Sequence, residues 1–89
     1  MNSRTTERFR KAFDDLPDEI KRLAKKNYEL WKDNPDHNSL KFKKIKASEE
    51  IYSIRIGKGW RALGLKQNDN IVWFWIGSHS EYDKLIGNF

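Results

Sequence analysis

The sequence predicts an α+β domain in which an N-terminal helical hairpin packs on a four-stranded antiparallel sheet. Three observations predict this class. Apolar residues recur at helical spacing in the first third of the chain, later segments have the alternation and the β-branched or aromatic composition of strands, and turn residues separate the last three strands. Strands that follow one another through tight turns pair antiparallel, and helices beside them bury their apolar stripe against one face of the sheet.

The first predicted helix follows from a stripe at i, i+3, i+4 and i+7, formed by Phe9, Ala12, Phe13 and Leu16. Thr5 or Thr6 can cap its start, and Glu7 suits the first turn because the helix dipole is positive there. Pro17 then breaks the helix. Because helix signals begin by Thr6, we expect no ordered strand before this helix.

The second predicted helix begins at Pro17, which suits a first helical turn. Its apolar face is formed by Ile20, Leu23, Ala24, Tyr28 and Trp31. Asn27 is the single polar interruption. The helix should end before Asn34-Pro35, because the residue that precedes a proline avoids helical geometry.

The sheet follows from a change of period at residue 40. Leu40 and Phe42 alternate with lysines, and three β-rich segments come next, at Ile51–Ile56, Trp60–Lys66 and Asn70–Ile76. Residues 57–59 and 67–70 have the composition of hairpin turns. Glu81–Ile86 has room for a short C-terminal helical turn.

Two of these strands are apolar on both faces. In Trp60–Leu65 one face holds Trp, Ala and Gly and the other Arg and two Leu, and in Ile71–Ile76 neither face is polar. Two short helices cover only one face of the sheet. Large exposed apolar patches usually mark binding sites, so we expect a partner protein on the second face.

Size and composition narrow the functional classes. The 89 residues, 1–89, fit a single domain, and the absence of cysteine excludes disulfides and thiolate metal sites. The longest apolar run, Ile71–Ile76, is far shorter than the roughly 20 residues of a membrane helix. The N-terminus lacks the apolar stretch of a signal peptide, so we expect a cytoplasmic protein without membrane contact. The two histidines, His37 and His79, lie far apart in the chain; we expect neither a metal site nor a cofactor.

The net charge of +5 is compatible with two anionic partners, a nucleic acid or an acidic protein surface, and also with a merely solvated surface. A basic stripe is formed by Lys41, Lys43, Lys44 and Lys46, with Lys58 in a turn. Such lysines give salt-sensitive affinity for RNA phosphates. Lysines that guard sheet edges against aggregation are an equally good interpretation.

Four other residues stand out as candidates for chemistry: Arg55, Arg61, His79 and Tyr82. The two arginines flank a tight turn, so a hairpin would bring them within reach of one phosphate. In a helical turn, His79 and Tyr82 would share a face. These groups suit RNA cleavage by its own 2′-hydroxyl, which needs a cation for the phosphorane and groups for proton transfer. A carboxylate partner for each arginine, a capping role for His79 and an edge-of-core role for Tyr82 are the structural alternatives.

The order of segments resembles the RelE/ParE superfamily of toxins. The resemblance is carried by Leu16-Pro17, Asn34-Pro35 and Ser39–Phe42, by Tyr52–Gly57 and Gly59–Leu63, and by Trp73–His79 with Tyr82. It implies a toxin held inactive by a cognate antitoxin. By resemblance, a RelE-like member would cleave mRNA on the ribosome, with Arg61 on the phosphate, His79 in acid–base transfer, Tyr82 stacking on the substrate and Arg55 as a scaffold or phosphate-positioning residue.

The resemblance leaves alternatives open. A ParE-like member would block DNA gyrase without catalytic residues, and a toxin-like fold without toxicity is a third reading. Ser53 stands where several ribonuclease members have a lysine, so a dense set of catalytic lysines is not expected. Glu49 or Glu50 could supply a base, although both fall in a polar turn.

Overall fold

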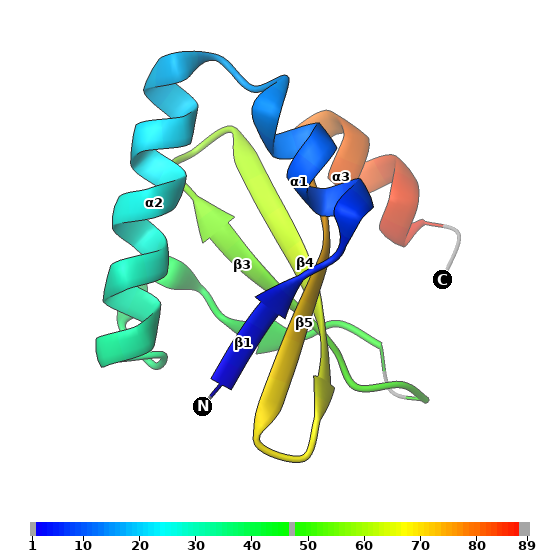
Figure 1. Ribbon diagram of the computed structural model, residues 1–89. Helices are drawn as coiled ribbons and strands as arrows, with labels where there is room; N and C mark the ends of the chain where they lie inside the picture. Colours follow the sequence, from blue (N-terminus) through cyan, green and yellow to red (C-terminus); the bar gives the residue numbers. More distant parts are fainter. Residues whose placement is uncertain (1, 47, 88–89) are drawn as a thin grey trace.

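The computed structural model describes residues 2–46 and 48–87, which form a five-stranded sheet with helices on both sides (Figure 1). The strands are β1 (Asn2–Thr5), β2 (Lys43–Lys44), β3 (Ile51–Ile56), β4 (Trp60–Gln67) and β5 (Asn70–Ser78). The helices are α1 (Glu7–Asp14), α2 (Asp18–Asp33) and α3 (His79–Ile86), with a 3-10 helix, η1, at Asn38–Leu40. The sheet order is β1-β5-β4-β3-β2, so the predicted α+β class is confirmed.

The helical hairpin forms as its end signals predict. The Thr6 side chain accepts a hydrogen bond from the Phe9 N–H at 3.1 Å and caps α1. Helix α2 begins directly after Pro17 and ends at Asp33, one residue before Asn34-Pro35. Asn27, the polar interruption, donates a hydrogen bond to the backbone carbonyl of Arg55 at 3.2 Å and ties α2 to β3. The two helices pack on one face of the sheet over a core that includes Trp31, Ile54 and Trp73.

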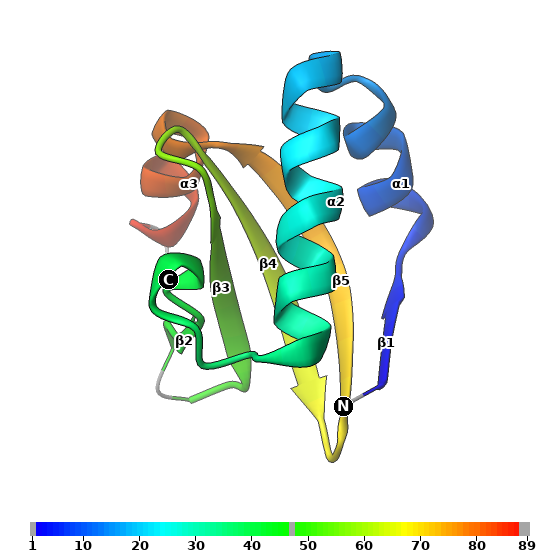
Figure 2. The same cartoon turned by 90° about the vertical axis from the view of Figure 1, so that its left-hand side faces the viewer.

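The N-terminal edge of the sheet differs from the prediction. The expectation of no strand before the first helix was wrong, because Asn2–Thr5 forms β1, which pairs parallel with β5 (Figure 2). The Asn2 N–H donates to the Asp69 carbonyl and the Thr6 N–H to the Trp73 carbonyl, both at 3.0 Å. The strand is polar and short, so its stability comes from this distant partner rather than from a local pattern. The sheet is therefore mixed rather than purely antiparallel.

The opposite edge differs as well. The expected strand at Leu40–Phe42 was wrong, because Leu40 ends the 3-10 helix and Lys41 has left-handed backbone angles, φ 48° and ψ 40°. A two-residue strand, β2, follows at Lys43–Lys44 and pairs antiparallel with β3. Leu40 is fully buried. Its apolar side chain fills the core from a turn, which alternation alone could not distinguish from a strand.

The second face of the sheet is covered by the chain itself. The expected helical turn is a two-turn helix, α3, which packs on β4 and β5 from the side opposite α2 (Figure 1). Tyr82 of α3 joins Ile51 and Leu63 in a second buried cluster. Among the described residues, the one large apolar side chain classed as exposed is Tyr28, on α2. The argument for a partner on an exposed apolar sheet face was therefore wrong, because the apolar side chains described on that face are buried or half-buried.

A β-bulge explains why β5 is apolar on both faces. Leu63 of β4 pairs with Trp75 while Gly64 pairs with Trp73, which leaves Phe74 as an extra residue on β5. The bulge reverses the alternation of the strand. Trp73 and Ile76 consequently pack under α1 and α2, whereas Phe74 and Trp75 pack with the cluster under α3.

Candidate functional site

A polar cleft of about 510 Å³ opens on the α3 side of the sheet. It is lined by Lys41, Phe42, Lys43, Ser53, Arg55, Arg61, His79 and Tyr82. The structure thus brings all four residues singled out for chemistry together with two lysines of the basic stripe. They come from the segment around β2, from β3 and β4, and from α3, so the fold is required to assemble them.

The two arginines lie directly opposite each other on β3 and β4. Arg55 Nε donates to the Gly57 carbonyl at 2.9 Å, and Arg61 Nη1 donates to the Trp60 carbonyl at 2.7 Å. Within residues 2–46 and 48–87, neither guanidinium forms a salt bridge with a carboxylate. Partial burial, and then the Arg55 charge, lower the pKa of Arg61. The pair is a concentrated positive charge that an anion would stabilise.

Helix α3 holds its functional side chains through a defined start. The Ser78 hydroxyl accepts from the Glu81 N–H at 3.2 Å, and the Glu81 carboxylate accepts from the Ser78 N–H at 3.1 Å, which completes a capping box. These hydrogen bonds lower the pKa of Glu81. The backbone N–H of His79 donates to the Gly59 carbonyl at 2.8 Å, which ties the helix to the β3–β4 turn. His79 is therefore positioned from both sides.

Tyr82 connects the histidine with the arginine. The Arg61 guanidinium carbon lies 5.9 Å from the centre of the Tyr82 ring, and the His79 ring centre lies 6.2 Å from it. Tyr82 is only 7% exposed and also lines the cleft, so it is both an edge-of-core residue and part of the candidate site. The guanidinium rests on the aromatic face, which favours its cation. Arg61 and His79 consequently face the same cleft.

Asp83 extends this group and was missed by the sequence analysis. Its Oδ1 lies 3.3 Å from His79 Nε2, one helical turn away. The i, i+4 spacing on a helix was the available signal, but the helix itself was expected only as a short turn. A carboxylate on one ring nitrogen fixes the orientation of an imidazole and leaves the other nitrogen for proton exchange.

Gly77 provides the space between these groups. It pairs with Arg61 across the sheet, and a Cβ atom at this position would lie 2.7 Å from Cζ2 of Trp75. The Trp75 ring passes over Gly77 and packs 6.5 Å from the ring of Tyr82, centre to centre. A side chain here would displace the aromatic support of the cleft.

The lysines of the basic stripe divide into two groups. Lys41 and Lys43 line the cleft beside Phe42, a second residue that the sequence analysis did not select. Lys44, Lys46 and Lys58 do not line it, and their contact with phosphate stays a prediction. Ser53 is 3% exposed and also lines the cleft.

The acidic residues of the β2–β3 turn lie outside the cleft lining. Glu50 accepts from Lys44 Nζ at 2.9 Å, and Glu49 accepts from Lys46 Nζ at 3.3 Å. The first of these hydrogen bonds raises the pKa of Lys44 and lowers the pKa of Glu50. Both glutamates are exposed, and neither is positioned as a base for the cleft.

Two features of the described residues bear on other classes of function. No group of three or more His, Cys, Asp or Glu side chains within residues 2–46 and 48–87 is arranged to hold a metal ion. His37 instead accepts a hydrogen bond from the Ser39 N–H at 3.2 Å and caps the 3-10 helix. No helix in the described part of the chain has the length and apolar character needed to cross a membrane.

Solved structures share this fold. A chain of the RelB–RelE antitoxin–toxin complex from Methanococcus jannaschii is 26% identical, with a TM-score of 0.70 over 90% of this chain and 95% of that chain. The isolated RelE toxin of E. coli is 15% identical, with a TM-score of 0.67 over 98% and 96% of the two chains. YafQ of E. coli is 14% identical, with a TM-score of 0.68 over 91% and 96%. The two E. coli proteins show similarity of fold.

The family is shown by the sequence itself. No significant match was found among curated proteins. A family model of the ParE-like toxin domain matches residues 18–84, from the start of α2 to α3, and this span contains every residue that lines the cleft. The chain therefore belongs to the ParE-like toxin domain family, within the RelE/ParE superfamily of toxin–antitoxin toxins.

Proposed function

We propose that this toxin is a metal-independent endoribonuclease that cleaves mRNA on the ribosome in the cytoplasm. One observation carries the proposal: Arg55 and Arg61, without a carboxylate partner among the described residues, share a cleft with His79 and Tyr82. A toxin that acts only by binding another protein needs no imidazole beside a pair of arginines. The cleft provides both requirements of phosphodiester cleavage, a charge clamp and a group for proton transfer.

The reaction is an internal transfer within the RNA. The 2′-oxygen attacks the adjacent phosphorus and loses its proton, the bond from phosphorus to the 5′-oxygen breaks, and that oxygen gains a proton. The products are a 2′,3′-cyclic phosphate and a 5′-hydroxyl. Arg61, with Arg55 beside it, stabilises the extra negative charge on the phosphorane.

His79 performs one of the two proton transfers, oriented by Asp83 through the 3.3 Å contact at Nε2. Dependence on the ribosome leaves the other transfer to a group outside this chain. Tyr82 and Phe42 provide aromatic surfaces for stacking of the bases, and Lys41 and Lys43 contact flanking phosphates. The reaction uses no cofactor.

An antitoxin is the proposed protein partner. The similar chain from M. jannaschii was solved in an antitoxin–toxin complex, as were similar chains from Pyrococcus horikoshii and E. coli. We infer that this chain is also held inactive by a bound antitoxin until the antitoxin is lost.

Inhibition of DNA gyrase is the second candidate, because the matching family is named for ParE. The two functions separate after induction of the lone toxin in cells. If the toxin is a ribonuclease, cells should stop growing and contain broken messages, with normal plasmid supercoiling. The growth arrest and the message cleavage should both be lost in Arg61→Ala. Intact messages with altered supercoiling would instead support the gyrase inhibitor. Lys26 is an exposed residue of α2, so Lys26→Ala is the matched control and should stay toxic.

A further inference from the structure

The cleft of the candidate site holds positive charge without a counter-charge. Within the described part of the chain, its lining contains four lysine and arginine side chains and no carboxylate. The four cations are Lys41, Lys43, Arg55 and Arg61. Asp83, on the adjacent helix, lies outside the lining and contacts His79 Nε2 at 3.3 Å instead. An anion in this cleft therefore meets cations that no acidic side chain of the lining neutralises.

Backbone carbonyls fix the two guanidinium groups of the cleft. Arg55 donates its Nε–H to the Gly57 carbonyl at 2.9 Å, and Arg61 donates from Nη1 to the Trp60 carbonyl at 2.7 Å. Both terminal nitrogens of Arg55, and Nε and Nη2 of Arg61, have no acceptor among residues 2–46 and 48–87. A guanidinium has five N–H donors in one plane, so most donors of the pair stay available. Because the groups are oriented before an anion binds, little conformational entropy is lost on binding.

The charge of the pair matches a dianion. A phosphodiester of RNA has a single negative charge, and attack by the deprotonated 2′-oxygen converts it into a dianionic phosphorane. A phosphate monoester also has two negative charges above its second pKa of about 6, and its three terminal oxygens accept hydrogen bonds strongly. A monoester therefore offers Arg55 and Arg61 the charge of the phosphorane in a stable molecule. Charge-assisted hydrogen bonds to arginine are among the strong ones, so this match should be visible in affinity.

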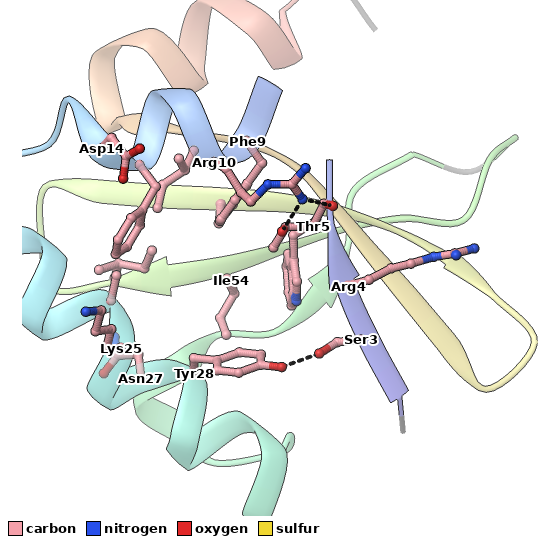
Figure 3. A pocket seen from close by; sticks show the side chains of 16 residues that line it. Ser3, Arg4, Thr5, Phe9, Arg10, Asp14, Lys25, Asn27, Tyr28 and Ile54 are labelled. Atoms are coloured by element: carbon pink, nitrogen blue, oxygen red, sulfur yellow. Dashed lines mark hydrogen bonds between the residues drawn. The ribbon is translucent and has the colours of Figure 1, made fainter. Parts of the chain in front are cut away.

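The second cavity of the molecule lacks this arrangement and provides a control. It has a volume of about 540 Å³, lies between α1, α2, β1 and the sheet, and shares no lining residue with the cleft. Arg10 is exposed there and donates from Nη1 to the carbonyl and hydroxyl oxygens of Thr5, at 2.7 and 3.1 Å (Figure 3). The acidic Asp14 also lines this cavity. Arg10 is thus an arginine outside the cleft that can be changed in the same way as Arg55.

We propose that the Arg55–Arg61 pair is a dianion-binding site at which phosphate monoesters, such as the 3′-phosphate end of an RNA, compete with mRNA and inhibit the toxin. The competition rests on the proposed function, whereas the preference for a dianion rests on the geometry of the pair. The 2′,3′-cyclic phosphate product is still a diester with one charge, so it leaves readily. Water that adds across the bond from phosphorus to the 2′-oxygen opens this ring to a 3′-phosphate, which has two charges and is the inhibiting form.

Two nucleotides with the same base and different phosphate charge test the preference. Isothermal titration calorimetry of the purified free toxin at pH 8 compares uridine 3′-phosphate with uridine 2′,3′-cyclic phosphate. We expect the 3′-phosphate to bind at least roughly tenfold more tightly. Equal affinities, or tighter binding of the cyclic form, would overturn the proposal. Inorganic phosphate distinguishes the sources of the dianion: affinity equal to that of the nucleotide supports inhibition by free phosphate, and weaker binding supports inhibition by RNA ends.

Arginine substitutions inside and outside the cleft test the location. A ligand that binds the folded state raises Tm, so uridine 3′-phosphate should raise Tm of the wild type and of Arg10→Gln equally. Arg55→Gln should lose most of this rise and at least roughly tenfold in affinity. Arg55→Lys keeps the charge without the planar guanidinium and should recover only part of the affinity. An unchanged response in Arg55→Gln, or an equal loss in Arg10→Gln, would place the nucleotide elsewhere and overturn the proposal.

The two proposals fail separately. Messages left intact by the wild-type toxin would remove the ribonuclease, but the calorimetry and the Tm measurements need no RNA cleavage and would still decide the dianion site. Where mRNA is cleaved, added uridine 3′-phosphate should raise KM for the message and leave kcat unchanged. A lower kcat at unchanged KM would show that the nucleotide does not compete for the cleft, and would overturn the inhibition while the ribonuclease stands.

Discussion

Arg55 and Arg61 face each other across β3 and β4, and among the described residues neither guanidinium has a carboxylate partner. Like charges directly opposite in a sheet are destabilising, typically by roughly 0.2–1 kcal/mol. A pair of this kind is retained at a functional site at the expense of stability.

Removal of one charge should stabilise the free toxin. We expect Arg55→Gln to raise Tm at low ionic strength by relieving repulsion of Arg61, and to raise it less in 1 M salt, where charges are screened. Thermal unfolding at both salt concentrations measures the difference. Lys58→Gln, an exposed change in the adjoining turn, is the control and should leave Tm nearly unchanged. A lower Tm for Arg55→Gln at low salt would show that the pair is not repulsive in the folded state.

The His79–Asp83 contact predicts a positioning role for the carboxylate. Asp83→Asn should lower kcat for mRNA cleavage by roughly tenfold and leave KM close to wild type, because the imidazole loses its orientation while the phosphate contacts remain. Asp83→Glu, which can restore the contact, should recover part of the rate. His79→Gln should cost more, roughly 10²–10⁴-fold, because the transferring group itself is removed. A wild-type kcat for Asp83→Asn would show that Asp83 does not position His79 for the reaction.

The capping box links α3 stability to pH. The pKa of Glu81 is lowered in the fold by hydrogen bonds from Ser78, so its stabilisation is present above its unfolded pKa of about 4.3 and is lost as pH falls through the folded value. Glu81→Gln should therefore lower Tm at pH 7, and the difference from wild type should shrink below about pH 4. Thermal unfolding between pH 3 and 7 gives the comparison. A difference that grows on acidification would contradict this account.

Gly77 should tolerate no side chain. In Gly77→Ala the new Cβ would lie 2.7 Å from the Trp75 ring. The ring must therefore move, which disrupts its contact with Tyr82. We expect the variant to fold with a lower Tm and to lose most RNA cleavage. Gly59→Ala is the matched control, because a Cβ there would meet no described atom within 4 Å apart from its neighbours in the chain. Equal activity of the two variants would show that the cleft does not require glycine at position 77.

The phosphate contacts predict a change in salt dependence. Each lysine that neutralises one phosphate of a single strand contributes about 0.7 to the slope of log K against log salt. Lys43→Gln should reduce the slope for a single-stranded RNA by about that amount, whereas Lys26→Gln on α2 should leave it unchanged. Fluorescence anisotropy across a salt series measures both slopes. Identical slopes for wild type and Lys43→Gln would exclude this lysine from the RNA contact.

Local signals in the sequence were sufficient for most of the fold. The Thr6 cap, Pro17 and Asn34-Pro35 set the ends of the first two helices, and Gly57 with φ 59° marks the turn that opposes Arg55 and Arg61. The missing parts depend on distant partners. The strand β1 exists because it pairs with β5. The extra residue Phe74 in β5 changes which apolar side chains face each side of the sheet, and a simple alternating pattern does not predict such a bulge.

Most residues of the candidate cleft were predictable from the sequence, but the length of the helix beside it, α3, was not. Hairpin pairing placed the two arginines together, and helical spacing placed His79 beside Tyr82, because both rules are local. The extent of α3, and with it the contact of Asp83, depended on apolar packing of Leu85 and Ile86 against the sheet.

The central claim is that Arg61 and His79 act on one phosphate. The most direct measurement is cleavage of a translated mRNA by purified toxin with ribosomes, with analysis of the product ends for wild type, Arg61→Ala and His79→Ala. We predict 2′,3′-cyclic phosphate and 5′-hydroxyl ends for wild type, and a rate reduced at least a hundredfold in each variant. Undiminished cleavage by both variants would contradict the account.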